Sequence, residues 1–156
     1  MAYPSDGDPI KHDVLEALRA NMEAIEPPSY RHDVRRAEVF GGQEIQLGRS
    51  LPAIVIVPEK DQVDKYLTCQ RIQNVMDVTV YGAVRVIPGS TAWRKSIQWL
   101  LADIKAAVNA DFQLSGQAVY IDLVGEDLPE IIDSNIAVGS VSLRVAYRHD
   151  FLNPTN

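Results

Sequence analysis

The stretch that decides the fold is TCQRIQNVMDVTVYGAVRVI, Thr68–Ile87. Apolar residues recur in it at every second position, and polar residues occupy most positions between them. The apolar series is Ile72, Met76, Val78, Val80, Val84 and Val86. A period of two over this length predicts a strand with one buried face and one face in water. Asn74 and Gly82 interrupt the apolar series, which indicates a bulge or a bend.

The residues before this strand predict a helix. Asp8 can cap its start, and Pro9 suits the first helical position, where a missing N–H costs nothing. The apolar residues that follow at helical spacing are Ile10, Val14, Leu18, Met22 and Ile25. Since Pro27-Pro28 cannot continue the pattern, we expect a helix from Pro9 to Ile25.

The residues after the strand predict a second helix, from Thr91 to Asn109. Its apolar stripe is Trp93, Ile97, Leu100, Leu101, Ile104 and Val108. Trp93 lies within this stripe and is expected in the core. Trp99 lies next to the stripe and is a candidate interface anchor.

Four further segments are predicted as strands. Arg31–Phe40 is a weak candidate, and Ala53–Val57 is a β-branched run between two prolines. Gln117–Val124 and Ile136–Phe151 complete the set. In the last segment the apolar positions change parity at Gly139, which predicts a bulge there.

Three segments between these elements are predicted as connections. Gly41–Pro52 and Pro58–Thr68 are interpreted as extended loops, and Gly125–Ser134 as an acidic link. The first loop lacks both a dinucleotide-binding glycine pattern and the lysine of a phosphate loop, so we interpret it as a flexible hairpin or a subunit arm.

The order is therefore helix, three strands, helix, two strands. Without a β-α-β alternation, it predicts an α+β domain in which two helices pack on a mainly antiparallel or mixed sheet of about five strands. A chain of 156 residues is the size of one domain. We expect residues 1–156 to form that domain, with flexible ends at 1–8 and 152–156.

Composition restricts the function classes. The formal charge of −6 argues against general nucleic-acid binding, which needs a clustered excess of lysine and arginine. The single cysteine, Cys69, forms neither an intrachain disulfide nor a cysteine-pair zinc site and fits synthesis in the cytoplasm. No apolar stretch is long enough to span a bilayer, so no membrane partner is expected.

Each of the three histidines stands between a basic residue and an aspartate, in KHD at Lys11–Asp13, YRHDV at Tyr30–Val34 and YRHDF at Tyr147–Phe151. Neighbours on a strand point to opposite faces, so an adjacent aspartate cannot orient the histidine. The spacing of the histidines is not that of metal ligands either. We therefore predict no catalytic residues, no metal site and no cofactor.

Several charged residues are instead candidates for subunit or tube contacts. Arg31, Arg35 and Arg36 form a basic cluster in an acidic chain, either as a solvated edge or as a contact with an acidic neighbouring subunit. In the closing strand, Arg148 and Asp150 share the face opposite Val145 and Tyr147. The remaining candidates are Gln43, Glu44, Arg49, Asp61, Asp64 and Trp99.

Taken together, five segments resemble the tail terminator, or tail completion, proteins of long-tailed bacteriophages. They are HDVLEALRANMEAI, LPAIVIVPEKD, CQRIQNVMDVTVYGAV, WRKSIQWLLADIKAAV and VSLRVAYRHDFLNP. The resemblance lies in the order of these segments and in their residue patterns, and it covers most residues from about 10 to 154.

The resemblance implies a structural virion protein, assembled in the host cytoplasm and located in the tail or neck. Such proteins form a ring, usually a hexamer, that caps the head-proximal end of the tail tube, ends its polymerisation and presents a surface to the neck. The resemblance also implies candidate partners. These are other copies of the same chain, the tail tube protein, a neck or head-completion protein and a sheath protein. DNA would only pass through the channel, and Asp61 and Asp64 are candidates to face it.

Two alternatives remain open. The chain could form another head–tail joint, such as a head-completion or sheath-associated protein, since a fold does not determine a function. It could also be a small hydrolase that uses His149 or His32 with a distant carboxylate.

Overall fold

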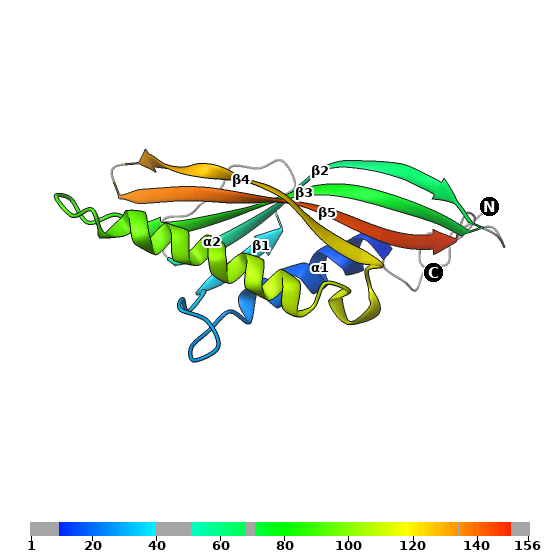
Figure 1. Ribbon diagram of the computed structural model, residues 1–156, viewed down its shortest axis with the longest axis horizontal. Coiled ribbons are helices and arrows are strands. Elements are labelled where there is room, and N and C mark those ends of the chain that lie inside the picture. Colours follow the sequence, from blue (N-terminus) through cyan, green and yellow to red (C-terminus); the bar gives the residue numbers. More distant parts are fainter. Residues whose placement is uncertain (1–9, 40–50, 68–70, 134, 151–156) are drawn as a thin grey trace.

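The computed structural model describes residues 10–39, 51–67, 71–133 and 135–150 (Figure 1). These residues form two helices, one 3-10 turn and one five-stranded sheet. The elements are α1 (Ile10–Glu23), β1 (Arg36–Val39), β2 (Ala53–Tyr66), β3 (Arg71–Arg85), α2 (Ala92–Ala110), η1 (Leu114–Gly116), β4 (Tyr120–Asp133) and β5 (Ile136–Asp150). The predicted α+β class and element order are confirmed.

The sheet has the order β1-β2-β3-β5-β4. Only the pair β1 and β2 is parallel, and the other three pairs are antiparallel. Both helices lie on the same side of this sheet, with α2 running along its length (Figure 1). The fold is therefore a helical layer on one face of a long, mostly antiparallel sheet.

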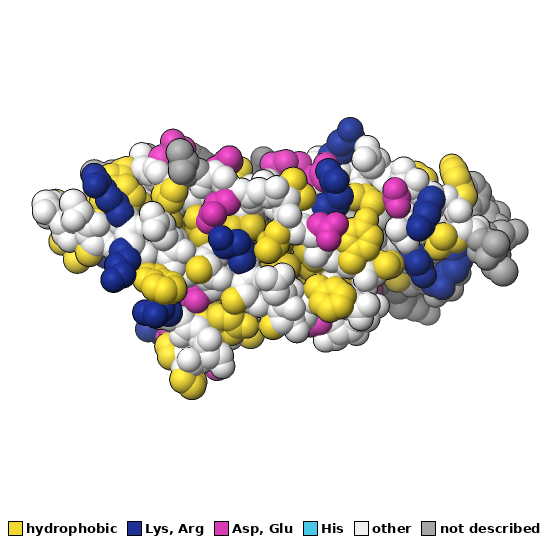
Figure 2. All heavy atoms as spheres, viewed as in Figure 1, with side chains coloured by type: hydrophobic (Ala, Val, Ile, Leu, Met, Phe, Trp, Pro, Cys, Tyr) yellow, Lys and Arg dark blue, Asp and Glu magenta, His cyan; other side chains and the backbone are white. Residues whose placement is uncertain are grey.

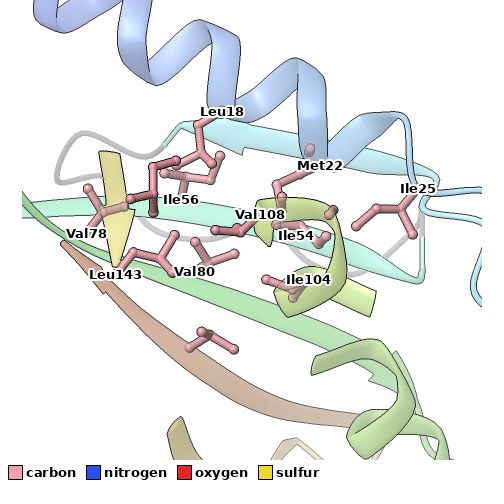
Figure 3. Close-up of a cluster of buried hydrophobic side chains, with 14 of the residues drawn as sticks. Leu18, Met22, Ile25, Ile54, Ile56, Val78, Val80, Ile104, Val108 and Leu143 are labelled. Carbon is pink, nitrogen blue, oxygen red and sulfur yellow. The ribbon is translucent and has the colours of Figure 1, made fainter. Parts of the chain in front are cut away.

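The core lies between these two layers. Leu18 and Met22 of α1 and Ile104 and Val108 of α2 meet the apolar face of the sheet, on which Val80 is central (Figure 3). The alternate residues predicted to face inward from β3 are buried. Each such side chain contributes about 1.5–3 kcal/mol when it leaves water. The prediction that the other face lies in water is wrong, because Gln73, Val75, Thr79 and Ala83 on that face are buried as well.

The predicted bulge at Gly139 is wrong. β3 and β5 stay in one continuous register from the pair Arg71 and Asp150 to the pair Arg85 and Ile136. Gly82 and Gly139 are direct partners in this ladder, so Gly82 marks no bulge between these two strands either. Both glycines face α2, and a Cβ atom built on Gly139 would lie 2.8 Å from Cδ1 of Leu101. The glycines let the helix approach the sheet closely.

The second strand is longer than predicted. We expected a strand over Ala53–Val57 and a loop over Pro58–Thr68, but β2 continues to Tyr66. This longer strand contains Pro58 and several charged residues. Its pairing with β3 accommodates them through two register shifts, one between Pro58 and Lys60 and one between Val63 and Lys65. The pairing partner, rather than local apolar periodicity, defines this half of the strand.

The acidic link is also a strand. The segment 125–133, predicted as a connection, belongs to β4, and three register shifts against β5 accommodate it. The first strand is shorter than predicted, since β1 covers only Arg36–Val39 of the expected Arg31–Phe40. The predicted flexible ends and all but the last two residues of the loop at 41–52 lie outside the described residues.

Candidate functional site

A buried carboxylate on α2 anchors the segment between α1 and β1. Both oxygens of Asp103 accept backbone hydrogen bonds, Oδ1 from the N–H of Arg31 at 3.3 Å and Oδ2 from the N–H of His32 at 2.9 Å. Oδ2 also lies 3.2 Å from Nδ1 of the His32 ring. Asp103 belongs to the buried face of the helix. It therefore satisfies polar groups of a segment that has no ladder partner there.

The same histidine contacts a serine. Nε2 of His32 lies 3.1 Å from Oγ of Ser96, which lies on the same face of α2 as Asp103, about two turns earlier. Because a carboxylate only accepts, Nδ1 of His32 donates to Asp103, which leaves Nε2 as the ring atom that hydrogen-bonds the serine hydroxyl. The three side chains thus form a serine–histidine–aspartate chain, the arrangement that activates a serine nucleophile in hydrolases.

The neighbouring arginine covers a tryptophan. The guanidinium carbon of Arg31 lies 3.7 Å from the centre of the Trp99 ring, and Trp99 is 36% exposed. A cation over an aromatic face contributes about 0.5–1 kcal/mol at an exposed site. Arg31 and Trp99, both predicted as interface residues, are therefore brought together. Trp93 is partly buried against the core, as expected.

A second polar network lies on the helical side of the sheet, around Tyr147. The Tyr147 hydroxyl donates to Oδ2 of Asp61, and Nδ2 of Asn74 donates to Oδ1 of Asp61 at 3.1 Å. Lys11 of α1 reaches Oδ2 of Asp61 at 3.4 Å. His149 lies beside this group, with Nε2 at 3.4 Å from Oδ1 of Asn74. Asp61 therefore ties α1 to β2, β3 and β5.

This network has a consequence at alkaline pH. Burial, and next the hydrogen bond to Asp61, raise the pKa of Tyr147 well above its usual range. Its stabilising contribution is thus complete below the unfolded pKa of about 10 and is lost as the pH rises above it. Urea unfolding of Tyr147→Phe should show about 1 kcal/mol lower stability at pH 8 and a smaller further loss up to pH 11 than the wild-type chain.

The control for this prediction is Tyr66→Phe, because the Tyr66 side chain is 72% exposed. That variant should keep the wild-type dependence of stability on pH. Equal pH profiles for wild type and Tyr147→Phe would contradict the assignment of the titration to Tyr147.

A third network crosses three strands on the face away from the helices. Gln73 of β3 donates through Nε2 to Oδ2 of Asp64 at 3.1 Å and accepts from Nε of Arg148 at 3.0 Å. This places Arg148 opposite Tyr147, as the strand alternation predicts. Asp61 and Asp64 are both in β2 but belong to different networks, so the structure does not bring these two candidates together.

The basic cluster lies at and just before β1. Arg35 pairs with Asp33 at 3.5 Å, and Arg36 pairs with Glu38. All these side chains are about half exposed or more, and such surface pairs contribute about 0–1 kcal/mol each. The cluster is therefore a set of accessible guanidinium groups with weak local partners.

The opposite edge of the sheet, β4, is acidic. Four carboxylate side chains on it are exposed: Asp122, Glu126, Asp127 and Glu130. Figure 2 shows acidic side chains spaced along the course of this strand. Lys105 reaches Glu126 at 3.4 Å, and Ser140 donates to Asp127 at 3.2 Å. Sequence reasoning missed this surface because the run was interpreted as a solvated link.

Some predicted residues are not located. Gln43, Glu44, Arg49 and Cys69 lie outside the described residues, and for Asp150 only the backbone pairing with Arg71 is described. Among the described side chains, no group of three or more histidine, cysteine, aspartate or glutamate residues is placed to hold a metal ion. Over the same part of the chain, no helix is long and apolar enough to cross a membrane.

Comparisons with known proteins give likenesses to solved structures. No protein-family model matches the chain, and no curated protein sequence matches it. A chain in a solved structure described as "Virion of native gene transfer agent (GTA) particle" aligns with a TM-score of 0.38 and 10% sequence identity. The alignment covers 90% of this chain and 92% of that one. A likeness at this level assigns no function.

Proposed function

We propose that the chain is a structural virion protein of the tail terminator type. The observation that supports it best is that each of the five segments resembling these proteins lies in a different element, in the order α1, β2, β3, α2 and β5. In this role the chain forms a ring, usually a hexamer, on the head-proximal end of the tail tube. The ring ends tube polymerisation and offers a surface to a neck or head-completion protein.

The polar chemistry of the surface fits this role. The networks around Asp103, Asp61 and Gln73 each join separate elements of the fold. They stiffen a long sheet whose two edge strands, among the described residues, each pair on one side only and so offer edges for contacts with other chains. A ring requires such heterologous contacts, in which one surface of a subunit binds a different surface of the next.

The test is the morphology of particles assembled without this chain. We expect electron micrographs to show tubes of abnormal length, and tails of defined length to return when the chain is supplied. Tails of normal length that lack heads would instead favour another head–tail joint. Normal, head-bearing particles would contradict both virion roles.

The serine–histidine–aspartate chain supports a second candidate, a small hydrolase. Against it, the two Asp103 oxygens are already engaged by backbone N–H groups, which explains its burial without chemistry. Ser96 also lies within the helix α2, whereas a catalytic serine needs backbone donors aimed at the reacting oxyanion. We therefore favour a structural role for this triad.

A serine-reactive fluorophosphonate probe separates the two candidates. We expect Ser96 to remain unlabelled in the folded chain, with less than about 1% adduct by peptide mass spectrometry, because a serine within a helix has no backbone N–H donors aimed at a reacting oxyanion. Ser96→Ala provides the blank for non-specific labelling. Stoichiometric labelling of Ser96 that disappears in His32→Asn would support the hydrolase instead.

A further inference from the structure

The edge strand β4 combines three features that a solvated edge does not need. Among the described residues it pairs only with β5, so its other side is an open edge. Its side chains include Leu123, Val124 and Ile131, which are 40%, 56% and 49% exposed. Edges of this kind are usually protected from pairing, since they bind other strands readily. Here the exposed apolar side chains are interspersed with the exposed carboxylates along the strand.

The carboxylates determine which surface can cover this edge. Two copies of β4 brought side by side would place eight described carboxylates together, four from each strand. Like charges opposed across an interface cost several kcal/mol. A two-fold contact through β4 is therefore unfavourable, and the occupant of this edge must carry positive charge.

The same chain offers such a surface at the opposite edge of the sheet. There β1 pairs with β2 only, among the described residues, and Arg31, Arg35 and Arg36 are exposed at and before its start. Asp33 and Glu38 partly neutralise this cluster. Since these local surface pairs contribute little, carboxylates from another chain can replace them.

The lengths and charges agree with one orientation. The part of β4 before its first register shift, Tyr120–Leu123, has four residues, as does β1. Antiparallel pairing of these two segments would place the residues before β1 beside those after Leu123. Arg36 would then lie opposite Leu123 and Arg35 opposite Val124, two positions from both Asp122 and Glu126, and Arg31 would lie two positions from both Glu126 and Glu130. Parallel pairing would direct Arg31 and Arg35 away from Glu126 and Glu130.

We propose, building on the function proposed above, that β4 of one copy binds antiparallel to the β1 edge of a second copy. The contact joins two different surfaces, so it repeats from copy to copy and closes into a ring when the rotation permits. Arg35 and Arg36 contact the carboxylates of the neighbouring β4, and Leu123 and Val124 lose their exposure to water in the contact.

Charge reversal on the purified full-length chain tests this contact. The acidic-edge variant carries Glu126→Lys and Glu130→Lys, and the basic-edge variant carries Arg35→Glu and Arg36→Glu. Sedimentation velocity at 50 mM salt should show self-association of the wild type that weakens at 500 mM salt, because salt screens exposed charges. Each variant alone should associate at least about tenfold more weakly.

An equimolar mixture of the two variants should regain wild-type association. In the mixture the lysine-bearing β4 of one variant meets the glutamate-bearing β1 edge of the other, and the two unreversed edges meet each other, so every contact joins opposite charges. The matched control for the basic-edge variant, Arg94→Glu with Lys95→Glu on α2, makes the same change in net charge as that variant and should associate like wild type. Circular dichroism and thermal unfolding verify that every variant is folded.

Three results would overturn the proposal. They are a wild type that stays monomeric at every concentration at 50 mM salt, variants that associate normally, and a mixture that gains no association. The proposed function fails separately. A monomeric chain that still stops tube growth would remove only this interface, whereas an associating chain that does not stop growth would remove only the terminator role.

Discussion

Replacing Asp103 by alanine should lower the free energy of unfolding by about 2–4 kcal/mol. The carboxylate accepts from the N–H groups of Arg31 and His32 and contacts the His32 ring. Its removal leaves these donors in a partly buried site with no protein partner. Equilibrium urea unfolding of both proteins, followed by tryptophan fluorescence, measures the loss.

Asp111→Ala is the matched control, since Asp111 lies at the C-terminal end of the same helix. Its carboxylate also accepts a backbone hydrogen bond, from the N–H of Ser115 at 3.0 Å, but at an exposed site. Water can replace that partner, so the loss should stay below about 1 kcal/mol. Similar losses for the two variants would show that Asp103 is not the anchor of the segment before β1.

The Asp103 anchor shows why candidate sites were harder to predict than elements. The sequence places His32 beside Asp33, but the carboxylate that contacts its ring comes from α2, 71 positions away. Only folding brings such partners together. The signal that could have been used is an aspartate at a position of α2 whose neighbours Ile104 and Ala107 face the core.

Elements defined by local periodicity were predictable, and elements defined by pairing were not. The alternation in β3 and the stripe in α2 identify a strand and a helix without knowledge of any partner. By contrast, the distal half of β2 and the acidic half of β4 lack an apolar series, and pairing with β3 and β5 holds them. Propensity is a weak guide for such segments, because tertiary context overrides it.

The parity of β5 illustrates a different error. Ile136 and Val138 are apolar but lie on the face away from α2, whereas Gly139 lies on the face toward it. The sequence-based interpretation assumed that apolar residues always mark the buried face, so it placed a bulge where the strand is regular. Gly139 is the buried residue at this point of the strand. Its missing side chain, rather than an apolar one, marks the face that packs against α2.

Gly139→Val should destabilise the fold by about 3 kcal/mol, because α2 occupies the space that a side chain would need. A Cβ atom at this position would lie 2.8 Å from Cδ1 of Leu101, which is buried and cannot move away freely. Gly125→Val is the control, since a Cβ atom there meets nothing within 4 Å. Urea unfolding should separate the two variants by at least about 2 kcal/mol.

A double-mutant cycle locates the cause of this loss. Leu101→Val removes Cδ1, the atom nearest to the added Cβ, together with Cδ2, so Gly139→Ala should cost less in that background than in the wild type. We expect a coupling of about 1 kcal/mol in favour of the double variant. Strict additivity would mean that the helix does not lie on the glycine pair as described, and that the cost of Gly139 substitutions has another origin. A favourable coupling would tie the glycines of β3 and β5 directly to the position of α2 on the sheet.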